Sequence, residues 1–252
     1  MGNKTLLCFY PLIQQQEDTM HKVAVINFSG NVGKSSIAHY LLAPRLDCSV
    51  LSIESINDSA SSDNSLRGKE SEALQAELVT NDSLVVDVGA SNVEAFVDSI
   101  SQFEAGIDEL DLFIVPTVPA NKQQTDTLAT IDQLNIMGVN KKDIRVVLNQ
   151  FDKKSGPLER QYSQIFKSHA QYETFELSSE SYLPKHSFFE AFQNDDRTWD
   201  DVLNDDTDYR QLIADTDDKD KKLLYARKIG LKQLANGINR DLDRVFGVIF
   251  DA

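Results

Sequence analysis

The sequence is poor in cysteine, in basic charge and in long apolar runs, and each shortage excludes a class of protein. Its two cysteines, Cys8 and Cys48, are too few for a disulfide framework or a four-thiolate zinc site, which is typical of a reduced, cytoplasmic compartment. No stretch approaches the roughly 18 apolar residues that span a bilayer, so we expect no integral membrane segment. Acidic side chains outnumber basic ones by 40 to 25, and the formal charge of −15 disfavours direct DNA binding by the whole surface, although a local basic patch stays open.

What is present has the balance of an ordinary globular chain. The 252 residues are 41% hydrophobic and 26% charged, which excludes wholesale disorder and fits one α/β-sized domain, or a domain with an appendage. Residues 1–19 precede a clean strand pattern that opens at Met20. We expect them to be a loosely held N-terminal extension upstream of a natural start, with an extra edge strand at 5–10 as the alternative. The apolar run at 6–12 lacks the flanking residues of a secretory signal.

From residue 20 onward, short β-branched apolar runs alternate with helical patterns. We expect a polar loop at 57–65 and a helix that Pro44 ends. The expected strands are 22–27, 49–53, 84–88, 112–115, 144–148 and, as the last, 172–177, and the expected helices are 35–43, 66–78, 92–103 and 125–137. This alternation predicts an α/β fold with a doubly wound, mostly parallel sheet flanked by helices, formed by residues 20–195.

Residues 196–252 change character, and we expect an acidic segment and an amphipathic helix that pack on the same domain. The stretch 195–220 holds eleven aspartates, which indicates either a solvated acidic surface or a docking surface for a basic partner. Trp199 and three phenylalanines are expected to pack the C-terminal helix onto the core. Apolar residues then recur at helical spacing at Leu231, Leu234, Ile238, Leu242, Val245 and Ile249. Packing on the sheet is the simplest interpretation, and a dimer contact or a membrane-surface helix are the alternatives.

The strongest motif lies between the first strand and the first helix. Backbone N–H groups at this position can wrap an anionic phosphate, and the start of the helix adds positive potential. We expect Lys34 to neutralise the β- and γ-phosphates and Ser35 to offer a hydroxyl to Mg²⁺. Phe28 stands where the common phosphate-loop pattern has a glycine. The expected nucleotide-binding residues are Gly30, Asn31, Val32, Gly33, Lys34, Ser35 and Ser36.

This loop resembles that of the ParA/MinD-like deviant Walker-A P-loop ATPases, which reads Lys-Gly-Gly-x-Gly-Lys-Ser/Thr. The stretch INFSGNVGKSSIAHYLLAPRL is most similar to StbB-type plasmid stability proteins, and the resemblance covers about residues 20–195. It implies a cytoplasmic ATPase that binds MgATP, hydrolyses it slowly and acts in plasmid stability, partition or positioning. It also implies a nucleotide-dependent homodimer and a plasmid-encoded, StbA-like DNA-binding partner.

Two positions depart from the family pattern. Ser29 replaces the signature lysine that reaches the phosphates of a partner subunit, so another lysine substitutes, the dimer differs or hydrolysis is slow. After the second strand, Glu54 takes the first acidic position and can hold a magnesium-bound water, but Ile56 takes the second. Asn57 or Asp58 then remains to position the attacking water, or forms only a polar loop. The departures leave open a nucleotide-binding interaction module with little or no hydrolysis.

Two further landmarks follow apolar strands. Asp87 ends one strand and is expected to bind Mg²⁺ through water, with Gly89 beside it as a γ-phosphate sensor; capping of a turn is the alternative for Asp87. Asn149 matches the family's base-binding asparagine. Asn149-Gln150-Phe151-Asp152 also resembles the Asn-Lys-x-Asp motif of GTPases, in which the aspartate accepts hydrogen bonds from guanine. The family resemblance thus makes ATP the expected nucleotide, and the GTPase-like motif makes GTP the alternative. A phosphotransferase of related fold is a third hypothesis, with no acceptor pocket indicated.

Overall fold

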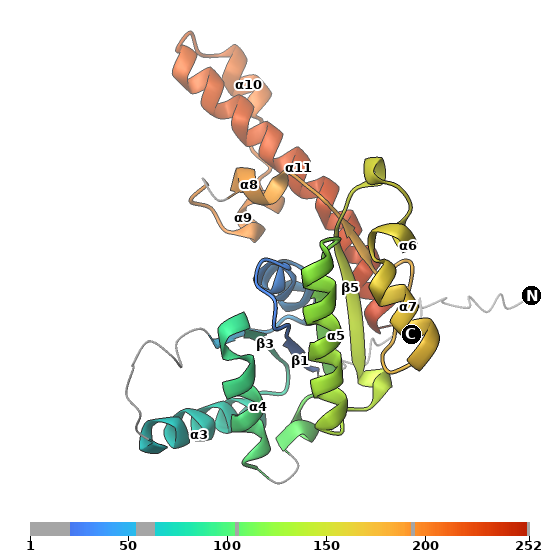
Figure 1. Ribbon diagram of the computed structural model, residues 1–252. Coiled ribbons are helices and arrows are strands. Elements are labelled where there is room, and N and C mark those ends of the chain that lie inside the picture. Colours follow the sequence, from blue (N-terminus) through green and yellow to red (C-terminus); the bar gives the residue numbers. More distant parts are fainter. Residues whose placement is uncertain (1–20, 54–63, 104–105, 193–194, 251–252) are drawn as a thin grey trace, which may run out of the picture.

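A six-stranded sheet forms the centre of the molecule (Figure 1). The computed structural model describes residues 21–53, 64–103, 106–192 and 195–250, without the side chains of 64–70. The strand order is β2-β3-β1-β4-β5-β6 and every pairing is parallel. The strands are β1 (Lys22–Val25), β2 (Val50–Ile53), β3 (Leu84–Val88), β4 (Leu112–Thr117), β5 (Ile144–Phe151) and β6 (Tyr182–Pro184). The predicted fold class is therefore confirmed. The expected extension at 1–19, the alternative strand at 5–10 and most of the loop at 57–65 lie outside the described residues.

Helices cover both faces of the sheet, as parallel strands require. One continuous helix follows β1 and consists of α1 (Lys34–Ser36), the π-helical turn η1 (Ile37–Leu42) and α2 (Ala43–Leu46). The other helices are α3 (Asn64–Thr80), α4 (Val93–Ser101), α5 (Asn121–Ile136), α6 (Leu158–Gln161), α7 (Ser163–Tyr172), α8 (Phe188–Phe192), α9 (Trp199–Leu203), α10 (Tyr209–Ala214) and α11 (Lys219–Phe250). Short 3₁₀ turns occur at η2 (Ala90–Asn92), η3 (Gly106–Glu109), η4 (Lys141–Asp143) and η5 (Lys153–Ser155).

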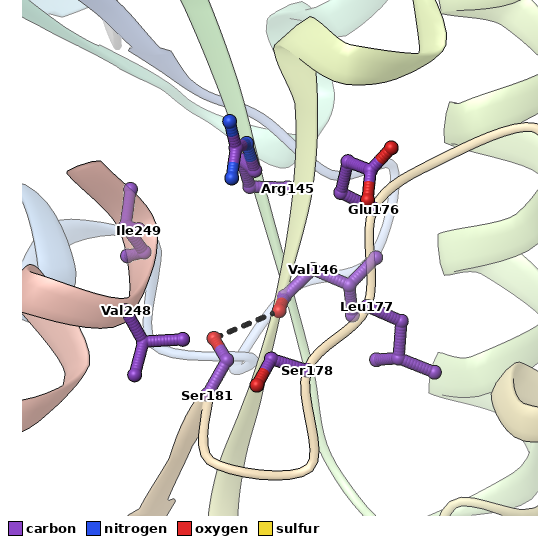
Figure 2. A pocket seen from close by; sticks show the side chains of 8 residues that line it. All are labelled: Arg145, Val146, Glu176, Leu177, Ser178, Ser181, Val248 and Ile249. Carbon is purple, nitrogen blue, oxygen red and sulfur yellow. Dashed lines mark hydrogen bonds between the residues drawn. The ribbon is translucent and has the colours of Figure 1, made fainter. Parts of the chain in front are cut away.

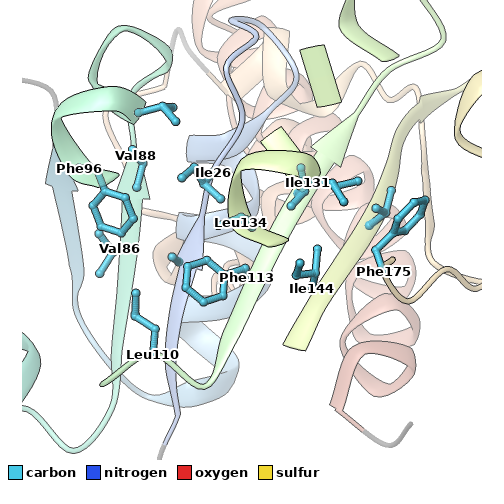
Figure 3. Packing of buried hydrophobic residues seen from close by; sticks show 14 of the residues in the cluster. Ile26, Val86, Val88, Phe96, Leu110, Phe113, Ile131, Leu134, Ile144 and Phe175 are labelled. Carbon is cyan, nitrogen blue, oxygen red and sulfur yellow. The ribbon is translucent and has the colours of Figure 1, made fainter. Parts of the chain in front are cut away.

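One face of the sheet packs against α3, α4, α5 and α7. Figure 3 shows Ile26, directly after β1, and Phe113 of β4 between Phe96 of α4 and Ile131 of α5, all of them buried. Because both faces of these strands are covered, their sequences are apolar at nearly every position, which is why short apolar runs predicted them.

The opposite face packs against the helix that follows β1 and against α8, α9 and α11. Phe188 and Trp199 lie with ring centroids 5.1 Å apart, next to Tyr40. Along α11, the apolar positions at 231, 238, 242, 245 and 249 are buried against this cluster, and Leu234 is partly buried. No helix in the described part of the chain is both long and apolar enough to cross a membrane.

The expectation that Pro44 ends the first helix is wrong, because the helix continues to Leu46. Proline lacks an N–H group and so leaves the carbonyl one turn earlier, on Tyr40, without its usual donor. Arg45 donates to Tyr40 O at 2.8 Å and to Leu41 O at 3.2 Å, which replaces the missing bond. The same guanidinium donates to Asp243 Oδ1 at 2.6 Å and so ties this helix to α11.

The expected last strand at 172–177 is also wrong. Tyr172 is the last residue of α7, and the following chain makes a single parallel bridge to β5, between Glu176 and Arg145. Figure 2 shows this irregular segment beside β5, with Ser181 Oγ donating to Val146 O at 3.0 Å. The pairing resumes only at β6, so the apolar character of 175 and 177 reflects burial beside the sheet rather than strand pairing.

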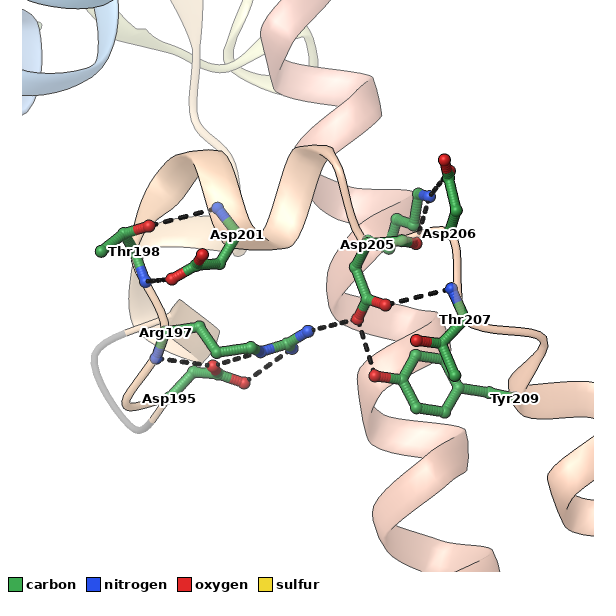
Figure 4. A network of polar contacts seen from close by, with 9 residues as sticks. Asp195, Arg197, Thr198, Asp201, Asp205, Asp206, Thr207 and Tyr209 are labelled. Carbon is green, nitrogen blue, oxygen red and sulfur yellow. Dashed lines mark hydrogen bonds and ion pairs between the residues drawn. The ribbon is translucent and has the colours of Figure 1, made fainter.

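The acidic stretch folds back on the basic first half of α11. Arg197 lies between two carboxylates and binds Asp195 and Asp205, each at 2.7 Å (Figure 4). Burial alone would raise the pKa of Asp205, but hydrogen bonds from Tyr209 and from residue 207, with the charge of Arg197, lower it to about 2. Lys232 of α11 donates to the backbone carbonyl of Asp205. Part of the acidic charge is therefore neutralised within the chain, while α10 and the first turns of α11 extend away from the sheet (Figure 1).

The packing of α11 predicts a contrast between two positions on that helix. Ile238→Ala empties a fully buried position and should lower the free energy of unfolding by about 3 kcal/mol. Leu223→Ala is the matched control, because Leu223 is 53% exposed and its loss should cost less than about 1 kcal/mol. Urea unfolding of both variants measures the difference. Equal effects would contradict the packing described above.

Candidate functional site

The loops that leave β1, β3, β4 and β5 meet at the carboxyl edge of the sheet. The strand order changes direction at β1, since β3 lies on one side of it and β4 on the other. In open parallel sheets such a switch point opens a crevice at the carboxyl ends of the strands, where ligands bind. The loop of residues 27–33, which precedes α1, occupies this position.

The backbone of this loop is fixed by two left-handed residues. Asn31 has φ of 57° and Gly33 has φ of 90°, and α1 begins directly after Gly33. A Cβ atom on Gly33 would lie 2.2 Å from Asn149 Nδ2, so both conformation and space require glycine. Gly30, Asn31 and Ser35 are exposed, Ser36 is half-buried and Val32 is buried.

Lys34 lies beneath the loop and is only 8% exposed. Its ammonium donates to Asn27 O at 3.2 Å and to Ser29 O at 2.8 Å. Burial lowers the pKa of Lys34, and the nearby carboxylate of Asp87 acts in the opposite direction. Because an ammonium has three N–H donors, one remains for an anion in the loop.

Asp87 lies in β3 between Val25 of β1 and Ser52 of β2 and is 3% exposed. Its Oδ1 is buried and has no hydrogen-bond partner among the described residues. A buried carboxylate oxygen is costly unless a cation or a donor reaches it. Mg²⁺ prefers such oxygen ligands, and the Ser35 hydroxyl is a second one. These donors therefore fit the predicted metal.

The end of β3 is tied to the end of β2. Asn92 Nδ2 donates to Ile53 O at 2.5 Å, and Gly89 N donates to the same carbonyl at 3.4 Å. A Cβ atom on Gly89 would lie 3.2 Å from Ile53 O, so the close approach favours glycine. Ile53 is the last described residue before the segment that holds Glu54, Ile56, Asn57 and Asp58, all of which lie outside the described residues.

Asn149 and Asp152 are in different environments, although they are three residues apart. Asn149 Nδ2 donates to Val32 O at 2.9 Å, so this side chain lies against the loop. Asp152 instead caps the turn η5, where its two oxygens accept from Lys154 N at 2.9 Å and Ser155 Oγ at 3.0 Å. The hydrogen bond from the Lys154 amide is the main cause of its lowered pKa.

A cavity of about 210 Å³ lies beside Asn149, between the start of α1 and the segment after β6. Its polar lining includes Lys185 and His186, which the sequence did not single out, and Asp152 is absent from that lining. Burial lowers the pKa of His186 and so favours the neutral imidazole. The charge of Asp241 acts in the opposite direction.

The sequence also gave no role to Asn27, although it anchors the loop. Its Nδ2 donates to Pro116 O and to Thr127 Oγ1, both at 2.8 Å, and its Oδ1 accepts from Ser29 N at 2.7 Å. Thr130 Oγ1, one turn along α5, accepts from Phe28 N at 3.0 Å. The available signal was an asparagine at the end of an apolar strand, together with polar residues at helical spacing on the buried face of α5.

Comparisons with known proteins indicate the fold. No family model matches the sequence, and no curated protein matches it. The chain is similar to the solved structure of ParA of pnob8, with 12% identity, a TM-score of 0.50 and coverage of 92% of this chain and 99% of that one. It is also similar to a McdA–ATP complex from Cyanothece (13% identity, TM-score 0.47, covering 89% and 97%). A third similar structure is the MinD cell division protein of Aquifex aeolicus (13%, 0.45, covering 78% and 98%). At these identities the likeness concerns the fold alone, and it rests on the ParA structure, whose TM-score reaches 0.50.

The geometry of the loop predicts unequal effects of two glycine substitutions. Gly33→Ala places a side chain at a positive φ and against the Asn149 amide, and should lower the free energy of unfolding by about 2 kcal/mol. Gly30→Ala is the control, because a Cβ atom there meets nothing within 4 Å, and its effect should stay below about 0.5 kcal/mol. Thermal or urea unfolding measures both, and a silent Gly33→Ala would contradict the described backbone.

Proposed function

We propose that this protein is a nucleotide switch with slow ATPase activity, which binds MgATP in the loop of residues 30–36. One observation carries the proposal: the buried Lys34 ammonium lies beneath a glycine loop at the switch point of a parallel sheet, together with the buried Asp87 Oδ1, which has no hydrogen-bond partner within the part of the chain that the structure describes. A cation and an anion in one cradle suit a ligand that brings both phosphate and metal.

The roles of the residues follow from their chemistry. Backbone N–H groups from Gly30 to Ser36 would surround the phosphates, and Lys34 would turn its free N–H toward the β- and γ-phosphates. Ser35 and Asp87 would hold Mg²⁺, which neutralises charge on the phosphate oxygens when bound. The Gly89 amide, already beside Ile53, would contact the γ-phosphate. Ile53 directly precedes the segment that carries Glu54 and Asp58. We keep these two as the candidates for a magnesium-bound water and for the attacking water.

The base-side residues favour ATP over GTP. Guanine recognition of the Asn-Lys-x-Asp type needs a carboxylate that reaches the base, whereas Asp152 accepts bonds within its own turn and does not line the cavity beside Asn149. Asn149 lies at the cavity next to the loop; its Nδ2 donates to Val32 O and its Oδ1 accepts from Gln150 N at 2.9 Å, so its second N–H and its second lone pair remain to match the acceptor and donor of an adenine edge. GTP remains the alternative that the binding experiment below decides.

The biological role is proposed from the resemblance of the loop to StbB-type plasmid stability proteins. Nucleotide binding would favour a homodimer or a complex with an StbA-like DNA-binding partner, and the partner would contact DNA, since this chain carries a formal charge of −15. Ser29 contributes only its carbonyl to Lys34 and supplies no positive charge to a second subunit, so turnover would be slow. An interaction module without hydrolysis is the alternative that this observation favours.

The deciding experiment measures ATP and GTP binding, with and without Mg²⁺, followed by turnover. Lys34→Ala should weaken MgATP binding by about 100-fold because charge-assisted bonds to phosphate are lost. Asp87→Asn should remove the gain in affinity that Mg²⁺ brings, while metal-free binding should not weaken, because a negative charge beside the phosphates is lost. Lys167→Ala, an exposed lysine on α7, is the matched control and should bind as the wild type does.

Each contrary result of this experiment has a defined meaning. A wild type that binds neither nucleotide would refute the proposal. If GTP bound more tightly than ATP, GTP would be assigned as the ligand in place of ATP. Tight ATP binding with no turnover, even with a candidate partner added, would establish the interaction module instead.

The lowered pKa of Lys34 predicts a pH dependence of binding. In the free protein, burial keeps this pKa below the ordinary 10.5, and bound phosphates would raise it by stabilising the ammonium. Binding therefore takes up protons at pH values between the two pKa values, so ATP affinity should fall as pH rises through the lowered pKa of the free protein and toward the higher pKa of the complex. Calorimetry from about pH 7 to about pH 10 measures this, because phosphate groups are already ionised above about pH 7. Inorganic triphosphate should show the same fall, and a constant affinity would contradict the assignment.

A further inference from the structure

We propose that Gln161 and Tyr162, at the junction of α6 and α7, are positioning residues for the nucleotide base. They hold residues 149–156, which are the irregular end of β5 together with the turn η5 and are called the 149–156 loop below, in the shape that places Asn149 against the cavity and the phosphate loop. The inference rests on the proposed function and adds the structural device that controls affinity for the base.

The loop of residues 149–156 does not hold its shape by local preference alone. Gln150 has φ of 62° and Gly156 has φ of 107°, so the chain turns through the left-handed region near both ends of the loop. This region is unfavourable for a residue with a side chain, such as Gln150. Contacts from elsewhere in the protein must therefore maintain the conformation.

The carboxamide of Gln161 closes the loop with three hydrogen bonds. Its Nε2 donates to Asp152 O at 2.8 Å and to Gly156 O at 2.7 Å, and its Oε1 accepts from Asp152 N at 3.3 Å. Both main-chain groups of Asp152 are thus bound by one side chain. The loop is fixed across its width at the point where it turns away from β5.

Tyr162 fixes the start of the same loop. The side chain is fully buried, and its hydroxyl donates to Asn149 O at 2.6 Å. Burial raises the pKa of Tyr162, so the phenol stays neutral and remains a donor. Since the Asn149 side chain donates to Val32 O, a single residue connects Tyr162 to the phosphate loop.

Gln124 of α5 anchors the pair. This buried carboxamide donates to Gln161 O at 2.9 Å and to Pro119 O at 2.8 Å, and accepts from Gln164 N at 3.1 Å. One turn further along α5, Thr127 accepts from Asn27 of the phosphate loop. The 149–156 loop, through Gln161, and the phosphate loop are therefore both held by hydrogen bonds to α5, which sets the spacing between their ligand-binding groups.

The test separates the base from the phosphates by using two probes, MgATP and inorganic triphosphate with Mg²⁺. Gln161→Glu keeps the size and the acceptor of the side chain but faces two carbonyls with a carboxylate, and Tyr162→Phe removes a single hydroxyl. Both variants should bind MgATP about tenfold more weakly, while affinity for triphosphate stays within about twofold of the wild type. Gln164→Glu is the matched control: its side chain contacts Asn121 and Thr125 of α5 and makes no bond to the loop. It should leave both affinities unchanged.

A smaller effect, or an unselective one, would overturn the inference. Unchanged ATP affinity in both variants, or equal losses for ATP and triphosphate, would show that these bonds do not position the base. If Gln161→Glu unfolds, Tyr162→Phe alone decides between the same outcomes. A wild type that binds triphosphate and ATP equally well would also refute the base-positioning role, whereas a wild type that binds neither refutes the proposed function itself.

Discussion

The carboxamide of Asn27 joins three parts of the chain, and the geometry of the candidate site depends on it. It binds the backbone at the end of β4, a threonine of α5 and the amide of Ser29. The backbone carbonyls of Asn27 and Ser29 in turn hold the ammonium of Lys34. A buried amide with all these bonds fixes the positions of its partners. Any displacement would leave a polar group without a hydrogen bond in the protein interior, which costs free energy. The loop is thereby held in shape before any ligand arrives.

The fold could be predicted from sequence because its strands are buried on both faces. Apolar runs of about four to six residues identified five of the strands. The glycine at 33 located the loop between the first strand and the first helix. Two elements were predicted wrongly for reasons that lie outside the local sequence. Arg45 replaces the donor that Pro44 lacks, and the segment at 172–177 has strand-like apolar residues but only one bridge to β5.

The candidate site divides in a similar way. Lys34 could be identified from the glycine-lysine-serine motif between the first strand and the first helix, and Asp87 from its position near the end of an apolar strand. Asn27, Gln124 and Gln161 could not, since each acts through a partner far away in the chain; the bond from Asn27 to Thr127 spans 100 residues. Asp152 shows the opposite case, in which a motif-like residue has both oxygens engaged by its own turn. Spacing gives the place of a side chain but not the partners that its polar atoms find.

The π-helical turn that follows the phosphate loop has a geometric consequence. A π turn accommodates one residue more than the α-helix it interrupts, and each residue of an α-helix advances about 100° around the axis. Every side chain after η1 therefore points about a quarter-turn away from the direction that an uninterrupted helix would give it. This rotation places Arg45 in line with Asp243 and Asn239 of α11. The π turn therefore sets the angular register between the helix of the phosphate loop and the C-terminal helix.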